Sequence, residues 1–347
     1  MQGSAYGQTI HDWHKLFEQK GAPTATLSFW VQGLYKDPSV WQRHISPELL
    51  ESLRVIFDFS LPEICKSQTA SDGTTKFQMR LRDGLEVETV LIPFHKRFTV
   101  CLSTQVGCGM NCGFCYTGTQ GLKRNLTAAE IVGQYLVAQN WARTHTSSKL
   151  RPSIVLMGQG EPLHNLDEVQ KALVILTHPQ MADVGHRQIT LSTVGYLPGI
   201  SSLTHFPRIN LALSLHSPFD EERSELIPVN QRWPIQEVLQ ALDEVPRLKR
   251  QFITFEYLLI KDFNMTERHA DELEKLLGKR AALLNLIPFN PFPGAKWQRP
   301  SVDEIEEFKA TLVKRRLRVM VRSTKGDDIL AACGQLKIKE MARNYAR

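Results

Sequence analysis

The sequence predicts an α/β protein in which a partial (β/α) barrel follows a small helical domain and a β-hairpin. Three observations support this class. Apolar residues have helical spacing within segment 1–74, two strands are expected within 75–96, and from residue 97 short apolar runs alternate with amphipathic stretches. This alternation is typical of repeated strand–helix units in a parallel sheet. No GxGxxG sequence follows a predicted strand, which favours a barrel over an open dinucleotide-binding sheet.

Segment 1–74 is predicted to be a helical accessory domain, and segment 75–96 a hairpin that connects it to the barrel. One helix is expected after Ser46, because Pro47 is tolerated in a first helical turn and apolar residues then follow at helical spacing. The hairpin has strands at 76–81 and 85–92. Asp83-Gly84 lies between them, and this dipeptide suits a two-residue turn.

The catalytic barrel is predicted over residues 97–336, with a basic C-terminal tail at 337–347. Its strands are expected at 97–104, 153–158, 188–192, 209–214, 252–260, 282–287 and 318–322. Four helix starts are indicated by capping residues, with capping boxes in the first two: Thr127 with Glu130, Ser301 with Glu304, Asn165, and Thr266.

Composition excludes several classes of protein. The chain has 347 residues, 42% hydrophobic and 22% charged, which excludes disordered, collagen-like and coiled-coil proteins. Its start is too polar for a signal peptide and it has no long apolar stretch, so we expect a cytoplasmic protein without membrane contact. The net charge of +6 suits a polyanionic partner without identifying RNA.

Four of the six cysteines lie between Cys101 and Cys115, and three of them form a CxxxCxxC loop: Cys108, Cys112 and Cys115. Disulfides are rare in the cytoplasm, and structural zinc usually has four ligands, often in two pairs. Three cysteines suit an iron–sulfur cluster with one iron left open. We therefore favour a cluster, and zinc with a distant fourth ligand such as His216 is the alternative.

Polar groups follow successive predicted strands, where a barrel places its active site. After the first strand comes the cysteine loop; the later segments are Gly158–Pro162, Ser192–Gly195, Ser214–His216 and Asn290–Gly294.

The chain resembles the RlmN/Cfr family of radical S-adenosylmethionine (SAM) RNA adenine methyltransferases. The resemblance extends over about residues 75–336. It is carried by the cysteine loop, Val87–Thr89, Cys101, Gln105–Gly107, Gly121 with 123–126, Gly160–Pro162, Leu191–Gly195, Ser214–His216, Asn290–Gly294, Gly326–Asp328 and Ala331–Leu336. The cysteine loop together with the distant sequence AACGQL is the most specific part.

This resemblance implies a radical-SAM type partial barrel with two cofactors, a [4Fe-4S] cluster and SAM. The cluster ligands would be Cys108, Cys112 and Cys115. The family's SAM contacts correspond to Gly160, Glu161, Ser192, Ser214, Leu215, His216 and Asn290. Taken singly, a polar residue at a strand end is as often a cap or a core residue.

The resemblance also implies roles for three further residues. Cys333 would accept a methyl group from SAM and become a carbon radical that adds to an adenine ring carbon. Cys101 would then attack the sulfur of Cys333, releasing the methylated base and forming a disulfide. Glu88 would act in proton transfer, although a carboxylate on a hairpin can equally be solvated. Cys65 matches no motif.

The implied substrate is an adenosine of 23S ribosomal RNA, methylated at carbon 2, with transfer RNA as a further substrate. An external flavodoxin-like electron donor and a monomeric protein are expected. Candidate RNA-facing cations are Lys123, Arg124, Arg315, Arg316, Arg318, Lys337, Lys339, Arg343 and Arg347. The alternatives are methylation at carbon 8 of an adenine in 23S ribosomal RNA, and a zinc-stabilised RNA-binding protein without catalysis. Gln159, Tyr116 and Val194 depart from the family pattern.

Overall fold

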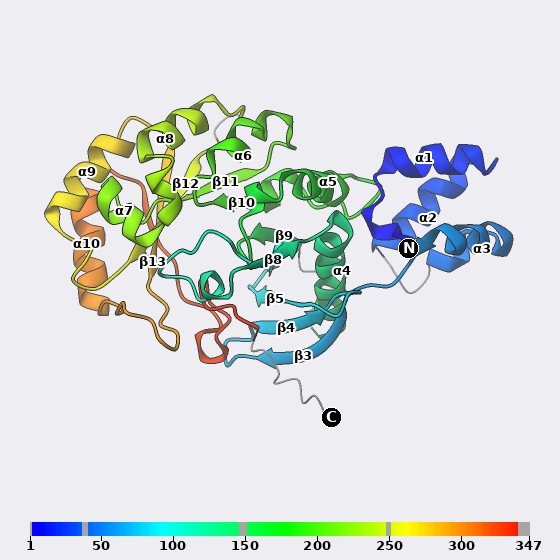
Figure 1. Cartoon of the computed structure of the whole chain (residues 1–347), viewed down its shortest axis with the longest axis horizontal. Helices are drawn as coiled ribbons and strands as arrows, with labels where there is room; N and C mark the ends of the chain where they lie inside the picture. The colour runs from blue at the N-terminus through cyan, green and yellow to red at the C-terminus, as the bar shows by residue number, and fades with distance from the viewer. Residues whose placement is uncertain (1, 37–40, 146–150, 248–250, 339–347) are drawn as a thin grey trace.

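The computed structural model describes residues 2–36, 41–145, 151–247 and 251–338 (Figure 1). Its centre is a curved sheet of ten strands in the order β14-β13-β12-β11-β10-β9-β6-β5-β4-β3. The strands are β3 (Glu63–Thr69), β4 (Thr75–Arg80), β5 (Glu86–Pro93), β6 (Arg97–Cys101), β9 (Arg151–Leu156), β10 (Ile189–Thr193), β11 (Asn210–Ser214), β12 (Ile253–Leu259), β13 (Ala282–Pro288) and β14 (Val319–Val321). The seven strands from β6 to β14 in this sheet are those predicted for the barrel, and they pair in parallel.

The predicted hairpin forms as β4 and β5, and it belongs to the same sheet. β5 pairs antiparallel with β6, β4 with β5, and β3 with β4. β3 lies within the segment 1–74 predicted to be helical. Its sequence EICKSQT lacks the apolar alternation that indicates a strand. This polar sequence fits its place, because β3 lies at the sheet edge and is mostly exposed. The domain boundaries at 74, 96 and 336 stay predictions.

The N-terminal helices are α1 (Ile10–Gln19), α2 (Thr24–Lys36) and α3 (Pro47–Ile56). The predicted start of α3 is confirmed, since Ser46 caps it by accepting a hydrogen bond from the Leu49 amide at 3.3 Å. Trp13 and Trp30 are fully buried and pack edge to face at 4.8 Å, which joins α1 to α2. A short parallel pair, β1 (Gly3–Ser4) and β2 (Phe57–Asp58), closes this region.

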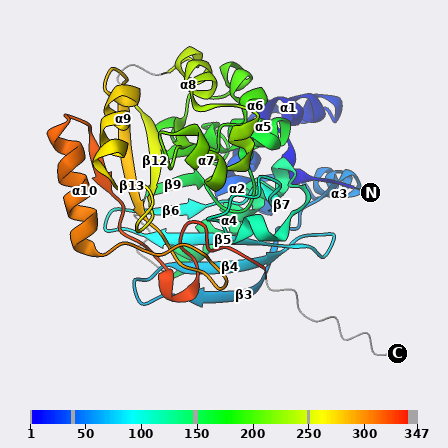
Figure 2. The same ribbon diagram turned by 60° about the vertical axis from the view of Figure 1, so that its left-hand side comes forward.

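The other α-helices of the described residues, α4 to α10, follow the strands around the curved sheet (Figure 2). They are α4 (Ala128–His145), α5 (Leu166–Thr177), α6 (Leu197–Ser201), α7 (Asp220–Leu226), α8 (Ile235–Glu244), α9 (Glu267–Leu277) and α10 (Val302–Lys314). The two predicted capping boxes are confirmed: Thr127 with Glu130 at the start of α4, and Ser301 with Glu304 at the start of α10.

Asn165 also begins a helix, but its side chain does not cap it. It is buried, and its Nδ2 donates to the carbonyls of Thr104 and Leu126 at 2.8 and 2.7 Å. These carbonyls flank a small antiparallel hairpin, β7 (Gln105–Gly107) with β8 (Leu122–Asn125), which encloses the cysteine loop. Asn165 therefore anchors the base of that loop.

Candidate active site

An open cavity of about 920 Å³ lies at the carboxyl ends of the parallel strands. It gathers ten of the thirteen predicted site residues: Cys108, Cys112, Cys115, Gly160, Glu161, Ser192, Ser214, His216, Asn290 and Cys333. Cys101, Glu88 and Leu215 do not line it. The wall of this cavity is thus drawn from segments far apart in the sequence, as a barrel mouth requires.

The cysteine loop is held at both ends by backbone contacts. Gly107 has φ +77°, and a Cβ there would lie 1.9 Å from the Gly121 carbonyl oxygen, so only glycine fits. The Cys108 amide donates to the same carbonyl at 2.9 Å, and the Gly113 amide donates to Leu226 of α7 at 3.0 Å. The loop is therefore fixed to both the β7–β8 hairpin and α7.

The three loop thiols line one wall of the main cavity. Burial raises the pKa of Cys108 to about 12 and also raises the pKa values of Cys112 and Cys115. Among the described residues, no three His, Cys, Asp or Glu side chains are grouped so as to hold one metal ion. A cluster does not require this convergence, because its thiolates bind different irons.

Glu161 is anchored beside the loop in the GxGEP turn. Gly160 has φ +103°, and a Cβ there would meet the Gln105 amide nitrogen at 2.8 Å. The buried Glu161 carboxylate accepts hydrogen bonds from the amides of Leu163 and Val194, both at 3.0 Å. Burial nevertheless raises the pKa of Glu161 to about 7. A nearby cation would therefore favour its ionised form.

His216 faces the cavity as a neutral ring. Its Nδ1 accepts a hydrogen bond from the Leu258 amide at 3.1 Å, which leaves the ring proton on Nε2. Burial lowers the pKa of His216 to about 3. Leu215, by contrast, is fully buried away from the cavity, so its side chain is part of the core.

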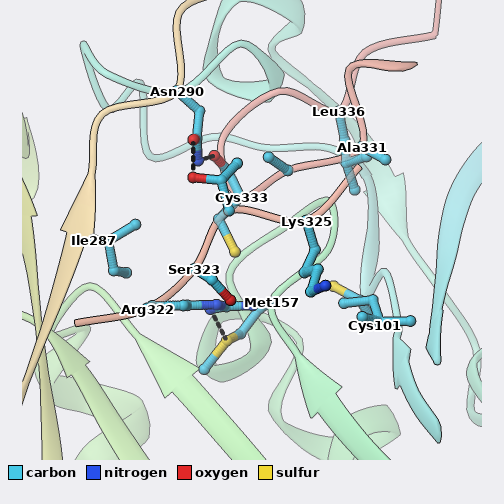
Figure 3. A pocket seen from close by; sticks show the side chains of 13 residues that line it. Cys101, Met157, Ile287, Asn290, Arg322, Ser323, Lys325, Ala331, Cys333 and Leu336 are labelled. Carbon is cyan, nitrogen blue, oxygen red and sulfur yellow. Dashed lines mark hydrogen bonds between the residues drawn. The ribbon is translucent and has the colours of Figure 1, made fainter. Parts of the chain in front are cut away.

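Cys333 and Cys101 line a second cavity of about 480 Å³, which shares Cys333, Asn290 and Arg322 with the first (Figure 3). Asn290 Nδ2 donates to the Cys333 carbonyl at 3.2 Å and so positions its loop. Burial raises the pKa of Cys101 to about 12, and Cys333 adds to this shift while Arg322 opposes it. The pKa of Arg322 is itself raised, chiefly by its electrostatic attraction to Cys333.

Glu88 is neither solvated nor part of either cavity wall. It is buried on β5, and its carboxylate lies 3.1 Å from Lys76 Nζ. Burial raises the pKa of Glu88, and its Oε2 has no hydrogen-bond partner among the residues that the structure describes. Lys76 also donates to the Leu330 carbonyl at 3.2 Å, which connects this ion pair to the loop of Cys333. Gln159 also contacts Glu88, because the Gln159 side-chain Oε1 accepts a hydrogen bond from the Glu88 backbone amide at 3.1 Å.

Sequence reasoning missed Glu256, a buried acid of β12 that lines the main cavity. Its Oε2 accepts a hydrogen bond from Asn285 at 2.7 Å, and burial raises the pKa of Glu256. A lone carboxylate within the apolar run ITFEYLL was the signal that could have identified it.

Two of the predicted RNA-facing cations are held in ion pairs: Arg124 with Asp83 and Glu130, and Arg315 with Glu267 and Asp271. Lys337 lies 4.4 Å from the Tyr116 ring, which stacks on Phe292. Lys339, Arg343 and Arg347 lie outside the described residues.

None of the helices that the structure describes combines the length and hydropathy that a membrane span needs.

The fold and the cysteine site define a radical SAM enzyme. A family model described as the Radical SAM superfamily matches residues 102–273. The structure is similar to the crystal structure of a radical SAM methyltransferase from Sphaerobacter thermophilus, with TM-score 0.88, 36% identity, and coverage of 96% of this chain and 98% of that one.

Relatives named "Dual-specificity RNA methyltransferase RlmN" narrow this class. The protein of Jannaschia sp. (strain CCS1) is 42% identical, over 85% of this chain and 77% of the relative. That of Paracoccus denitrificans (strain Pd 1222) is 43% identical, over 95% and 88%. The chain belongs to the RlmN family, and the predicted fold class and resemblance are confirmed.

Proposed function

We propose that this protein methylates carbon 2 of an adenosine in 23S ribosomal RNA, and also acts on transfer RNA, through an S-methylated Cys333 that Cys101 later resolves. One observation carries the proposal: Cys333 lines both the cavity of the three loop cysteines and the cavity of Cys101. The relatives named RNA methyltransferases support RNA as the substrate. We also expect a cytoplasmic monomer served by a flavodoxin-like electron donor.

The residues present fit both implied cofactors. Cys108, Cys112 and Cys115 would hold a [4Fe-4S] cluster, and Gly160, Glu161, Ser192, Ser214, His216 and Asn290 surround the space for SAM. Leu215 would contribute through its backbone only. When bound, these groups supply the methyl group and the radical that the reaction needs.

Cys333 would have to be a thiolate to accept the methyl group. Its sulfur would form a bond to the methyl carbon as S-adenosylhomocysteine leaves. Arg322 lines both of the cavities that Cys333 lines, which places a cationic side chain beside the site of methyl transfer. In the resolving step, the Cys101 thiolate attacks the Cys333 sulfur. The S–S bond forms while the bond from the Cys333 sulfur to the added carbon breaks. The electron pair stays on that carbon, which takes up a proton to become the methyl group of the base.

Glu88 lines neither cavity, so we place its role in supporting the Cys333 loop through Lys76 and Leu330. Direct proton transfer by Glu88 would require that loop to move.

Mass spectrometry of ribosomal and transfer RNA tests the proposal in cells that lack the gene and are complemented with variants. Cys333→Ala should abolish methylation, and Cys101→Ala should accumulate a covalent protein–RNA species. Cys65→Ala is the matched control, because Cys65 lies on β3 and lines neither cavity. Full methylation with Cys333→Ala would refute the mechanism, and methylation at carbon 8 would refute the regiochemistry.

Anaerobic purification tests the zinc alternative. A brown protein with iron supports the cluster, whereas a colourless protein with stoichiometric zinc and no iron contradicts it.

A further inference from the structure

A buried arginine lies behind the wall of the main cavity. Arg223 of α7 has an exposed fraction of 0%. Its Nε donates to the Leu215 carbonyl at 3.1 Å and its Nη1 to Asn230 Oδ1 at 2.5 Å. Its Nη2 donates to the carbonyls of Val194 and Ser214 at 2.6 and 2.9 Å. All four acceptors are neutral oxygens. None of these hydrogen bonds therefore supplies a negative charge to the guanidinium.

The described part of the chain also provides no ion pair for this charge. Among the salt bridges of the described residues, none includes Arg223. Asp220 attracts it electrostatically, but Asp220 Oδ1 already accepts from Asn230 Nδ2 and the Ile235 amide, both at 2.9 Å. Burial lowers the pKa of Arg223 to about 10, so it remains charged at neutral pH. A buried charge without a partner is costly, which points to an anion outside this set of contacts.

The position of the guanidinium indicates which anion this is. Val194 and Ser214 line the cavity of the three loop cysteines, whereas Arg223 does not. The charge therefore lies directly behind that wall, and it interacts electrostatically with Cys112. The same helix packs against the loop, because Leu226 belongs to the apolar cluster around Cys112 and its carbonyl accepts from the Gly113 amide at 3.0 Å.

We propose that Arg223 compensates the negative charge of the iron–sulfur cluster and so raises its reduction potential. The proposal rests on the cluster assigned in the proposed function. On reduction, one electron from an external low-potential donor enters the cluster, no bond forms or breaks, and the site becomes more negative by one charge. A fixed cation in apolar surroundings stabilises the reduced form more than the oxidised form. Arg223 is thus a positioning residue that acts on the cluster without touching substrate.

The test is a redox titration of the reconstituted, full-length holoprotein without SAM, followed by electron paramagnetic resonance. Arg223→Gln should lower the equilibrium constant for reduction at least tenfold, a midpoint about 59 mV more negative for one electron. Arg223→Lys keeps the charge and should retain most of the wild-type potential. Arg54→Gln, which removes one charge from the exposed side of α3, should leave the potential unchanged.

A wild-type potential in Arg223→Gln would overturn the proposal. An equally large shift in Arg223→Lys would also overturn it, because hydrogen bonding and not charge would then be responsible. If Arg223→Gln fails to fold, the double variant Asp220→Asn/Asn230→Asp tests the proposal in its place. It brings a carboxylate against Nη1 at constant net charge, so it should lower the potential, and no shift would refute the proposal.

Iron analysis separates this inference from the proposed function. A wild-type protein that binds no iron refutes both. If the wild-type protein binds a normal cluster and its reduction potential is unchanged by the Arg223 substitutions, only the role of Arg223 is refuted.

Discussion

Replacing Gly107 with alanine should detach the cysteine loop from the hairpin that supports it. Gly107 directly precedes Cys108, and both contact the Gly121 carbonyl. A Cβ on residue 107 would lie 1.9 Å from that oxygen, where real contacts essentially never fall below 3.0 Å. The two backbone segments must therefore separate by about 1 Å, and close-packed interiors resist such a shift.

The magnitude follows from comparison with Gly121→Ala. Both glycines have positive φ, +77° and +66°, and Gly121 combines it with ψ 177°, a region essentially restricted to glycine, so alanine at either position costs about 1–3 kcal/mol in backbone strain. A Cβ added at Gly121 meets no described atom within 4 Å beyond its chain neighbours, whereas a Cβ at Gly107 also overlaps the Gly121 carbonyl oxygen. Overpacking typically costs about 1–3 kcal/mol. Gly107→Ala should therefore be less stable than Gly121→Ala by about 1–3 kcal/mol.

Urea unfolding of the apoproteins measures this difference in the free energy of unfolding, and iron analysis after anaerobic reconstitution measures the effect on the site. We expect Gly107→Ala to bind much less iron than the wild type and Gly121→Ala to bind nearly as much. Equal stability and equal iron content in the two variants would refute the reasoning.

Two further predictions concern buried polar residues. Because burial raises the pKa of Glu256 above its usual 4.5, the folded state binds that proton more tightly than the unfolded state, and this contribution to stability is lost as the pH rises. Glu256→Gln cannot ionise, so its free energy of unfolding relative to the wild type should increase from about pH 5 to about pH 8; a constant difference in urea unfolding would contradict this. Asn165→Ala leaves the Thr104 and Leu126 carbonyls without their donor and should lower the free energy of unfolding by about 2 kcal/mol. An unchanged urea midpoint would show that other groups satisfy them.

The elements that sequence reasoning identified correctly carry local signals. The capping box at Thr127 is formed within one helical turn, and Asp83-Gly84 sets the turn between β4 and β5. β3 escaped detection because its polar residues lie at an exposed sheet edge. Asn165 was correctly placed at a helix start, but its side chain bonds two loop carbonyls instead, and residue type alone does not distinguish these uses.

The sequence by itself predicted the chemistry of the cysteine loop, because Cys108, Cys112 and Cys115 lie within eight residues in a pattern typical of a metal centre. Only the tertiary structure decided that Cys101 and Cys333 share a cavity and that the buried guanidinium of Arg223 lies behind Val194. The physical reason is that residue spacing reports burial and local hydrogen bonds. Contacts between strand ends depend instead on the order and register of the strands in the sheet.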